Sequence, residues 1–169
     1  MTTPITEPAP RTPRAGRDLP AAIAVGLGLG AVAIVLLLFA RPAFVGLIGA
    51  VMVVAVWEMR TTLRRARGIN VVWVPTALGS LATVVTTWWW GHEAQVVGLM
   101  LTALAILFVR LAGGAEGYLA DVTASIFLAV YLGGFGSFAT LLVAPEDGFG
   151  RVLVFLIAVV CSDTGGYAV

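Results

Sequence analysis

The residues best suited to chemistry lie near the end of the chain, in the run Ser162-Asp163-Thr164-Gly165-Gly166. The hydroxyls of Ser162 and Thr164 can donate hydrogen bonds to phosphate oxygens, and the carboxylate of Asp163 can bind a hard cation. The two glycines have no Cβ and would let a ligand approach the backbone closely. This pattern is typical of a metal–nucleotide site. It is equally typical of a helix C-cap that leads into a loop.

The expected depth of Asp163 in a membrane favours the metal–nucleotide site. Arg151 is expected at the outer surface, and Asp163 follows it by twelve residues. Twelve residues of helix rise about 18 Å, at roughly 1.5 Å per residue. The hydrocarbon core of a bilayer is about 30 Å thick, so Asp163 would lie on the order of 10 Å short of the cytoplasmic surface. A carboxylate at that depth is by default a candidate functional residue.

The composition is that of a membrane protein. Of the 169 residues, 60% are hydrophobic and 11% are charged, and the mean hydropathy is +1.01. An ordinary soluble domain carries roughly 25% charged residues. Ten basic residues against nine acidic ones argue against a nucleic-acid-binding module. A single cysteine, Cys161, excludes a disulfide scaffold.

Long uncharged runs divide most of the chain into segments close to the length of a membrane-spanning helix, about 20 apolar residues. The sequence therefore predicts an all-α fold, a polytopic helical membrane protein with about six transmembrane helices. Residues 1–20 hold five of the eight prolines and are predicted to form a disordered cytoplasmic tail rich in proline and arginine. Residues 21–169 would form the transmembrane helical domain. Its predicted spans lie near 21–40, 42–60, 71–90, 94–111, 119–143 and 149–162.

The arginines predict the orientation of these helices. Eight of them fall on one side of the predicted topology: Arg11, Arg14, Arg17, Arg60, Arg64, Arg65, Arg67 and Arg110. The opposite side has two, Arg41 and Arg151. Because basic loops stay in the cytoplasm, we expect a multi-pass protein of the inner (plasma) membrane with a cytoplasmic N-terminus. The end of the last helix, with Asp163, would also be cytoplasmic.

Two further carboxylates have structural and functional interpretations. Glu58 lies at the cytoplasmic end of the second predicted helix, where it could reach the surface, pair with Arg60 or face a polar cavity. Asp121 lies at the start of the fifth helix, where the helix dipole favours a negative charge. The structural interpretation is favoured for both residues. The run Trp88-Trp89-Trp90 is expected to be an aromatic anchor at the outer surface.

The run Ser162 to Tyr167, at the end of a membrane helix, resembles the S-D-T-G-[AG]-Y motif of phosphatidate cytidylyltransferases, the CDP-diacylglycerol synthases. Weaker similarities are the acidic residue after Trp57 and the run Tyr131-Leu132-Gly133-Gly134. The resemblance covers most of the chain in layout.

The resemblance implies that CTP and phosphatidate react to give CDP-diacylglycerol and pyrophosphate, in phospholipid biosynthesis at the lipid bilayer. The lipid phosphate would attack the α-phosphorus of CTP, with Mg²⁺ neutralising charge on the phosphates. It implies Asp163 as the catalytic residue and metal ligand, and Ser162, Thr164, Gly165, Gly166 and Tyr167 as substrate-binding residues. A monovalent cation beside Mg²⁺ and a homodimer are further expectations from the resemblance.

The chain also departs from this family's pattern. In the family the motif continues into a basic Ser-Pro-Lys loop, and later helices carry a Lys-Asp segment and a Gly-Gly…Asp-Arg…Asp signature. None of these follows Tyr167, and the chain has no lysine. We therefore expect an N-terminal fragment, truncated after the motif, that carries one wall of the site and is inactive alone.

Two alternative functions remain open on the sequence. One is a non-catalytic polytopic membrane protein, such as a transporter half or an assembly partner. It would need an intramembrane polar pathway, and the polar residues at depth are hydroxyls, which more often hold helices together: Thr76, Ser80, Thr83, Thr86, Thr87 and Thr102. The other is a CTP-dependent polyprenol or phytol kinase relative, which would use a different acceptor.

Overall fold

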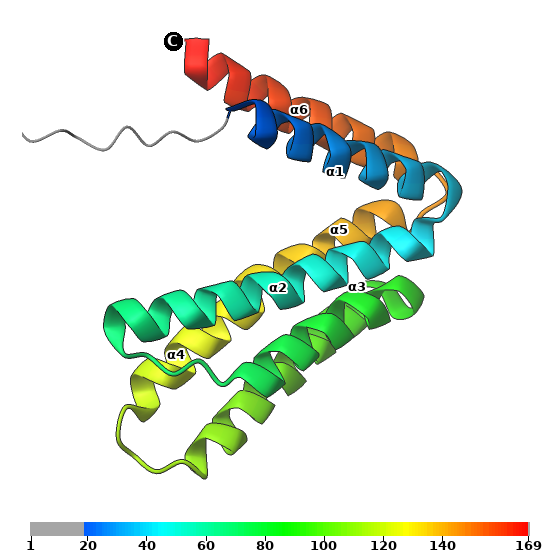
Figure 1. The fold of residues 1–169 in the computed structure, drawn as a ribbon. Coiled ribbons are helices and arrows are strands. Elements are labelled where there is room, and N and C mark those ends of the chain that lie inside the picture. The colour runs from blue at the N-terminus through cyan, green and yellow to red at the C-terminus, as the bar shows by residue number, and fades with distance from the viewer. Residues whose placement is uncertain (1–18, 169) are drawn as a thin grey trace, which may run out of the picture. The chain divides into compact units, whose positions relative to one another are not determined.

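The computed structural model describes residues 19–168 as a series of helices, and no strand occurs in this range. The predicted all-α fold is confirmed. The predicted tail, residues 1–20, lies outside the described residues except for Leu19 and Pro20, which begin the first helix. The elements are α1 (Leu19–Phe39), α2 (Arg41–Arg67), α3 (Trp73–Leu111), α4 (Tyr118–Leu128), the π-helix η1 (Ala129–Gly134), α5 (Phe135–Val143) and α6 (Gly148–Ala168), drawn in Figure 1.

Four stretches of the described chain are long and apolar enough to cross a membrane: Arg41–Arg67, Trp73–Leu111, Tyr118–Val143 and Gly148–Gly166. A shorter apolar helix covers Ala24–Phe39. The expected number of about six helices is therefore corrected to about five continuous ones. The difference arises in α3, because the spans predicted near 71–90 and 94–111 are both present but are joined at Gly91 without a loop, and so count as one element.

Gly91 divides α3 into a helical hairpin. Its φ of 60° and ψ of −143° are not helical, and this positive φ is a conformation that glycine adopts without a Cβ clash. Figure 1 shows the chain reversing within α3, so that residues 92–111 return beside residues 73–90. The 39 residues of α3 are thus two arms rather than one long rod.

Small residues let the two arms of α3 approach closely. A Cβ added at Gly79 in the first arm would collide with the side chain of Thr102 in the second. A Cβ added at Gly98 in the second arm would lie 2.6 Å from Oγ1 of Thr83 in the first. The hydroxyls of both threonines donate within their own arm, to the carbonyls of Gly79 at 2.8 Å and Gly98 at 2.7 Å. Glycine–threonine packing of this kind is typical of membrane helices.

The described part of the chain divides into two compact units, and the division falls between Ile34 and Val35. In the second unit, α3 contacts α2, α4, η1 and α5. One buried cluster contains Leu37, Val45, Val84, Val143 and Val152, and another contains Ile106, Val122 and Ala129.

The π-helix η1 contains the run Tyr131-Leu132-Gly133-Gly134 and packs tightly against α3. A Cβ at Gly133 would lie 2.8 Å from Oγ of Ser80, so a glycine is needed where the two helices meet. Single π-turns inside α-helices occur frequently at functional sites. In the described residues, however, η1 carries a close helix contact and no cluster of charged groups.

Candidate functional site

The motif Ser162 to Tyr167 lies within α6 and not after it. The predicted end of the last helix, near residue 162, is wrong, because the helix continues to Ala168. The Oγ1 of Thr164 donates to the carbonyl oxygen of Val160 at 2.7 Å, a bond to the preceding helical turn. The C-cap alternative is therefore also wrong, since Gly165 and Gly166 continue the helix.

The residues from Cys161 to Gly166 are exposed. Among the described residues, no ion pair or side-chain hydrogen bond engages the Asp163 carboxylate, and no group of three metal-ligating side chains is found. Ser162 and Thr164 flank Asp163 at about 100° to either side on the helix, while Gly166 lies one turn later on nearly the same side. The arrangement thus presents one carboxylate between two hydroxyls, beside a surface without side chains.

These residues fit Mg²⁺ in part. Mg²⁺ is commonly bound through one or two carboxylates together with waters and substrate phosphates. Asp163 can supply one such ligand, and the described residues form no group of three or more metal-ligating side chains around it. The motif could therefore contribute one ligand to a metal ion and does not by itself supply a complete set.

An ion pair lies at the opposite end of α6. Nε of Arg151 lies 2.9 Å from Oδ2 of Asp147, and the two side chains are 50% and 65% exposed. The hydrogen bond from Arg151 holds the pKa of the Asp147 carboxyl below its ordinary value of 3.8. Arg41 lies at the same end, where its Nη1 donates to the Pro145 carbonyl oxygen at 2.7 Å. The two arginines expected to share one side of the membrane thus lie at one end of the second unit.

Glu58 is exposed on α2. Its carbonyl oxygen accepts a hydrogen bond from Thr61, and its carboxylate forms no ion pair within the described part of the chain. Arg60, the partner considered from the sequence, instead lies with its guanidinium carbon 5.9 Å from the centroid of the Trp73 ring. The structure therefore brings Glu58 neither to Arg60 nor to the motif in α6.

Asp121 is 3% exposed and belongs to a polar network at the end of the bundle that includes Arg110. Its Oδ2 accepts from Nε of Arg110 at 2.9 Å, and its Oδ1 accepts from the backbone N–H of Asn70 at 2.7 Å. One turn later, Oγ of Ser125 accepts from the N–H of Val72 at 2.9 Å. The network ties the 68–72 connection to α4, which agrees with the structural interpretation of Asp121.

Sequence reasoning missed the role of Arg110 in this network. Besides Asp121, Arg110 donates to the carbonyl oxygens of Gly114 and Glu116, so it closes the loop between α3 and α4. A signal was present, because Arg110 and Asp121 are opposite charges at the facing ends of two apolar runs joined by a short loop. The number of arginines on each side predicts orientation but does not indicate which acidic side chain each arginine pairs with.

Curated relatives match nearly the whole chain. The phosphatidate cytidylyltransferase of Mycobacterium bovis is 40% identical over 96% of this chain and 57% of its own length. Those of Mycobacterium tuberculosis and Mycobacterium leprae are also 40% identical, over 96% and 94% of this chain and 53% and 55% of their own lengths. The chain therefore spans about half the length of these relatives.

No solved structure matches the chain. The model of the cytidylyltransferase family matches residues 20–169, which include every described span and the motif in α6. With that match, and with relatives at 40% identity along its length, the chain belongs to the cytidylyltransferase family.

Proposed function

We propose that the protein carrying this chain transfers the cytidylyl group of CTP to phosphatidate, giving CDP-diacylglycerol and pyrophosphate. The observation that carries the proposal is the 40% identity to phosphatidate cytidylyltransferases along 96% of the chain. The apolar helices support it, because the acceptor is a membrane lipid and the site must meet the bilayer. The exposed carboxylate and hydroxyls near the end of α6 supply a suitable surface.

In this proposal Asp163 is a ligand of Mg²⁺, which would supply charge neutralisation on the nucleotide phosphates. Ser162 donates a hydrogen bond to a phosphate oxygen, and Thr164 does so by turning its hydroxyl away from the Val160 carbonyl oxygen, while Gly165 and Gly166 leave room for the nucleotide beside the helix. Tyr167 is the remaining substrate-binding residue of the motif. The catalytic contribution of these groups is positioning and electrostatic stabilisation.

We also propose that the protein lies in the inner (plasma) membrane and that Asp163 faces the cytoplasm. Arg110 and the 68–72 connection after α2 meet through Asp121, so the arginine-rich loops gather at one end of the bundle. Arg41 and Arg151 lie at the other end. An excess of arginine marks the cytoplasmic side, where CTP is available.

The transport alternative has little support in the interior of the bundle. Thr76, Thr83, Thr87 and Thr102 are buried, and each donates to the carbonyl four residues earlier in its own helix. Hydroxyls that are satisfied within one helix and excluded from solvent do not line a polar pathway.

The test compares Asp163→Asn with Asp163→Ala in the gene's full reading frame. Membranes receive radiolabelled CTP, phosphatidate and Mg²⁺, and CDP-diacylglycerol is measured. Loss of one preorganised electrostatic contact typically lowers the rate about 10²–10³-fold, and both variants should show a loss of this order. Because Asp163 is exposed and mid-helix, both should keep the melting temperature of the parent.

Glu146→Gln is the matched control, since it removes another exposed carboxylate without touching α6. It should retain full activity. Normal turnover by Asp163→Asn would refute the role of Asp163. Absence of any CDP-diacylglycerol from the unsubstituted reading frame would refute the proposed reaction itself.

A further inference from the structure

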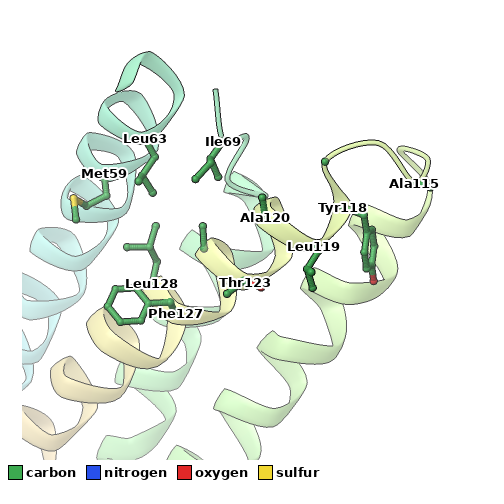
Figure 2. A pocket seen from close by; sticks show the side chains of 12 residues that line it. Met59, Leu63, Ile69, Ala115, Tyr118, Leu119, Ala120, Thr123, Phe127 and Leu128 are labelled. Carbon is green, nitrogen blue, oxygen red and sulfur yellow. The ribbon is translucent and has the colours of Figure 1, made fainter. Parts of the chain in front are cut away.

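An apolar groove of about 790 Å³ opens between the end of α2, the 68–72 connection and α4. Figure 2 shows Met59 and Leu63 of α2 beside Ile69 of the connection, with Ala120, Thr123, Phe127 and Leu128 of α4 below them. We call it the α2–α4 groove. Its lining includes Leu63 of α2 and, on α4, Tyr118, Ala120, Thr123, Phe127 and Leu128.

The α2–α4 groove has the length of one membrane leaflet. Its lining on α4 runs from Tyr118 to Leu128, which is ten residue steps, or about 15 Å at 1.5 Å per residue. One leaflet is half of a hydrocarbon core about 30 Å thick. A single acyl chain occupies one leaflet, so a groove of this length can hold one. The length therefore fits a lipid.

Positive charge lies just beyond the groove. Arg64, Arg65 and Arg67, the arginine cluster, are exposed on the last turns of α2, and none of them belongs to either ion pair of the described chain. Arg67 follows Leu63 by four residues, so the two lie on the same side of the helix. The acids next in sequence to groove residues are Glu58, Glu116 and Asp121, and Asp121 is already paired with Arg110, which leaves an excess of positive charge at this end.

A second groove can be compared with the α2–α4 groove. It measures about 670 Å³, runs along the two arms of α3 and includes Ala82, Trp90 and Glu93. It is similar in size and also apolar, and neither groove has an arginine in its lining, but the second groove includes the carboxylate of Glu93, whereas the arginine cluster follows Leu63 of the first on α2. Shape and apolar character alone therefore do not distinguish the two grooves, and the arginine cluster does.

We propose that the α2–α4 groove binds one acyl chain of an anionic glycerophospholipid, with the lipid phosphate held by Arg64 and Arg67. Basic residues next to clefts between membrane helices on the cytoplasmic side recognise anionic headgroups. The biological role rests on the proposed function, because phosphatidate, the proposed acceptor, belongs to this class of lipid. The binding itself requires only the groove and the arginines.

The experiment uses the protein from its full reading frame in lipid nanodiscs. The probes are phosphatidate and phosphatidylcholine that carry the same photoreactive diazirine in one acyl chain, and mass spectrometry maps the labelled residues. Each arginine near a membrane surface strengthens anionic-lipid binding about fivefold. Labelling around Leu63 and Thr123 should therefore be at least about fivefold stronger with phosphatidate. Arg64→Gln with Arg67→Gln should abolish that preference, and Arg151→Gln, at the opposite end of the bundle, should keep it.

A matched pair of substitutions tests the groove itself. Ala120→Trp fills the α2–α4 groove, and Ala82→Trp places the same side chain in the α3 groove; both alanines are exposed, so both variants should fold. Labelling around Leu63 and Thr123 should be lost in Ala120→Trp and unchanged in Ala82→Trp. Equal labelling by the two lipids, an unlabelled groove, or labelling that survives Ala120→Trp would overturn the proposal.

Cytidylyl transfer is measured on the same preparations. CDP-diacylglycerol formation with an unlabelled groove would refute lipid binding at this groove and leave the proposed reaction intact. Selective labelling without CDP-diacylglycerol would support the groove and refute the reaction.

Discussion

Removing Arg110 should destabilise the fold more than any other single loss of charge in the described chain. Arg110 and Asp121 are 14% and 5% exposed at the side chain, and their closest atoms are 2.9 Å apart. In Arg110→Ala the Asp121 carboxylate keeps the Asn70 N–H as its hydrogen-bond donor and loses its counter-ion. The carbonyls of Gly114 and Glu116 lose their donor as well, so the loop between α3 and α4 is released.

Substituting Arg110 should lower the stability of the fold more than substituting Asp121. Breaking a buried ion pair from one side costs about 3–5 kcal/mol, and the partial exposure of Arg110 places Arg110→Ala near 3 kcal/mol. Asp121→Asn keeps an oxygen to accept from Asn70, and Arg110 keeps two carbonyl acceptors. That variant should cost about 1.5–2 kcal/mol, at the lower end of the range for a hydrogen bond to a charged group. Combining the two substitutions should cost less than their sum, because the stranded carboxylate is then gone.

Thermal unfolding in detergent at a fixed scan rate measures these differences. For a chain of this size each 1 kcal/mol shifts Tm by roughly 2–4 °C, so Arg110→Ala should lower it by about 6–12 °C. Arg151→Ala is the control, since it breaks an exposed ion pair of the same 2.9 Å length and such pairs contribute little. Equal and small shifts for Arg110→Ala and Arg151→Ala would refute the reasoning, as would a larger loss in Asp121→Asn than in Arg110→Ala.

Three further predictions concern orientation, packing and pH. In a Cys161→Ser background, an impermeant thiol reagent on intact cells should label Glu146→Cys and not Arg65→Cys; the reverse pattern would invert the topology. Gly98→Ala should destabilise by about 1–3 kcal/mol through overpacking against Thr83, whereas Gly46→Ala, in open space on α2, should not; equal melting temperatures would contradict the hairpin contact. Arg151 lowers the pKa of Asp147 in the folded state, so this ion pair stabilises the fold fully at pH values above 3.8, the ordinary pKa of the carboxyl. The stabilisation is lost as the pH falls through the lowered pKa of the folded state. The Tm difference between the parent and Asp147→Asn should therefore vanish in acid, and a difference that grew on acidification would exclude this pair as its source.

The sequence by itself determined that the protein is helical and that it is a membrane protein. Hydropathy is a sum over neighbouring residues, so long uncharged runs predict spans without knowledge of what packs where. The metal–nucleotide site that the hydroxyls, carboxylate and glycines around Asp163 indicate stays a prediction. The resemblance of the Ser162 to Tyr167 motif predicted the family that the match over residues 20–169 then showed.

The tertiary structure decided everything that depends on residues distant in the chain. Asn70 and Asp121 are 51 residues apart, and their hydrogen bond follows from how α2, α3 and α4 pack. The continuation of α6 through Gly165 and Gly166 was likewise not predictable, because two glycines weaken a helix and suit a C-cap equally well. The α2–α4 groove exists only because Leu63 and Phe127 come from helices that meet at one end of the bundle. Local composition thus sets which segments enter the membrane, whereas long-range packing sets which side chains meet once they are there.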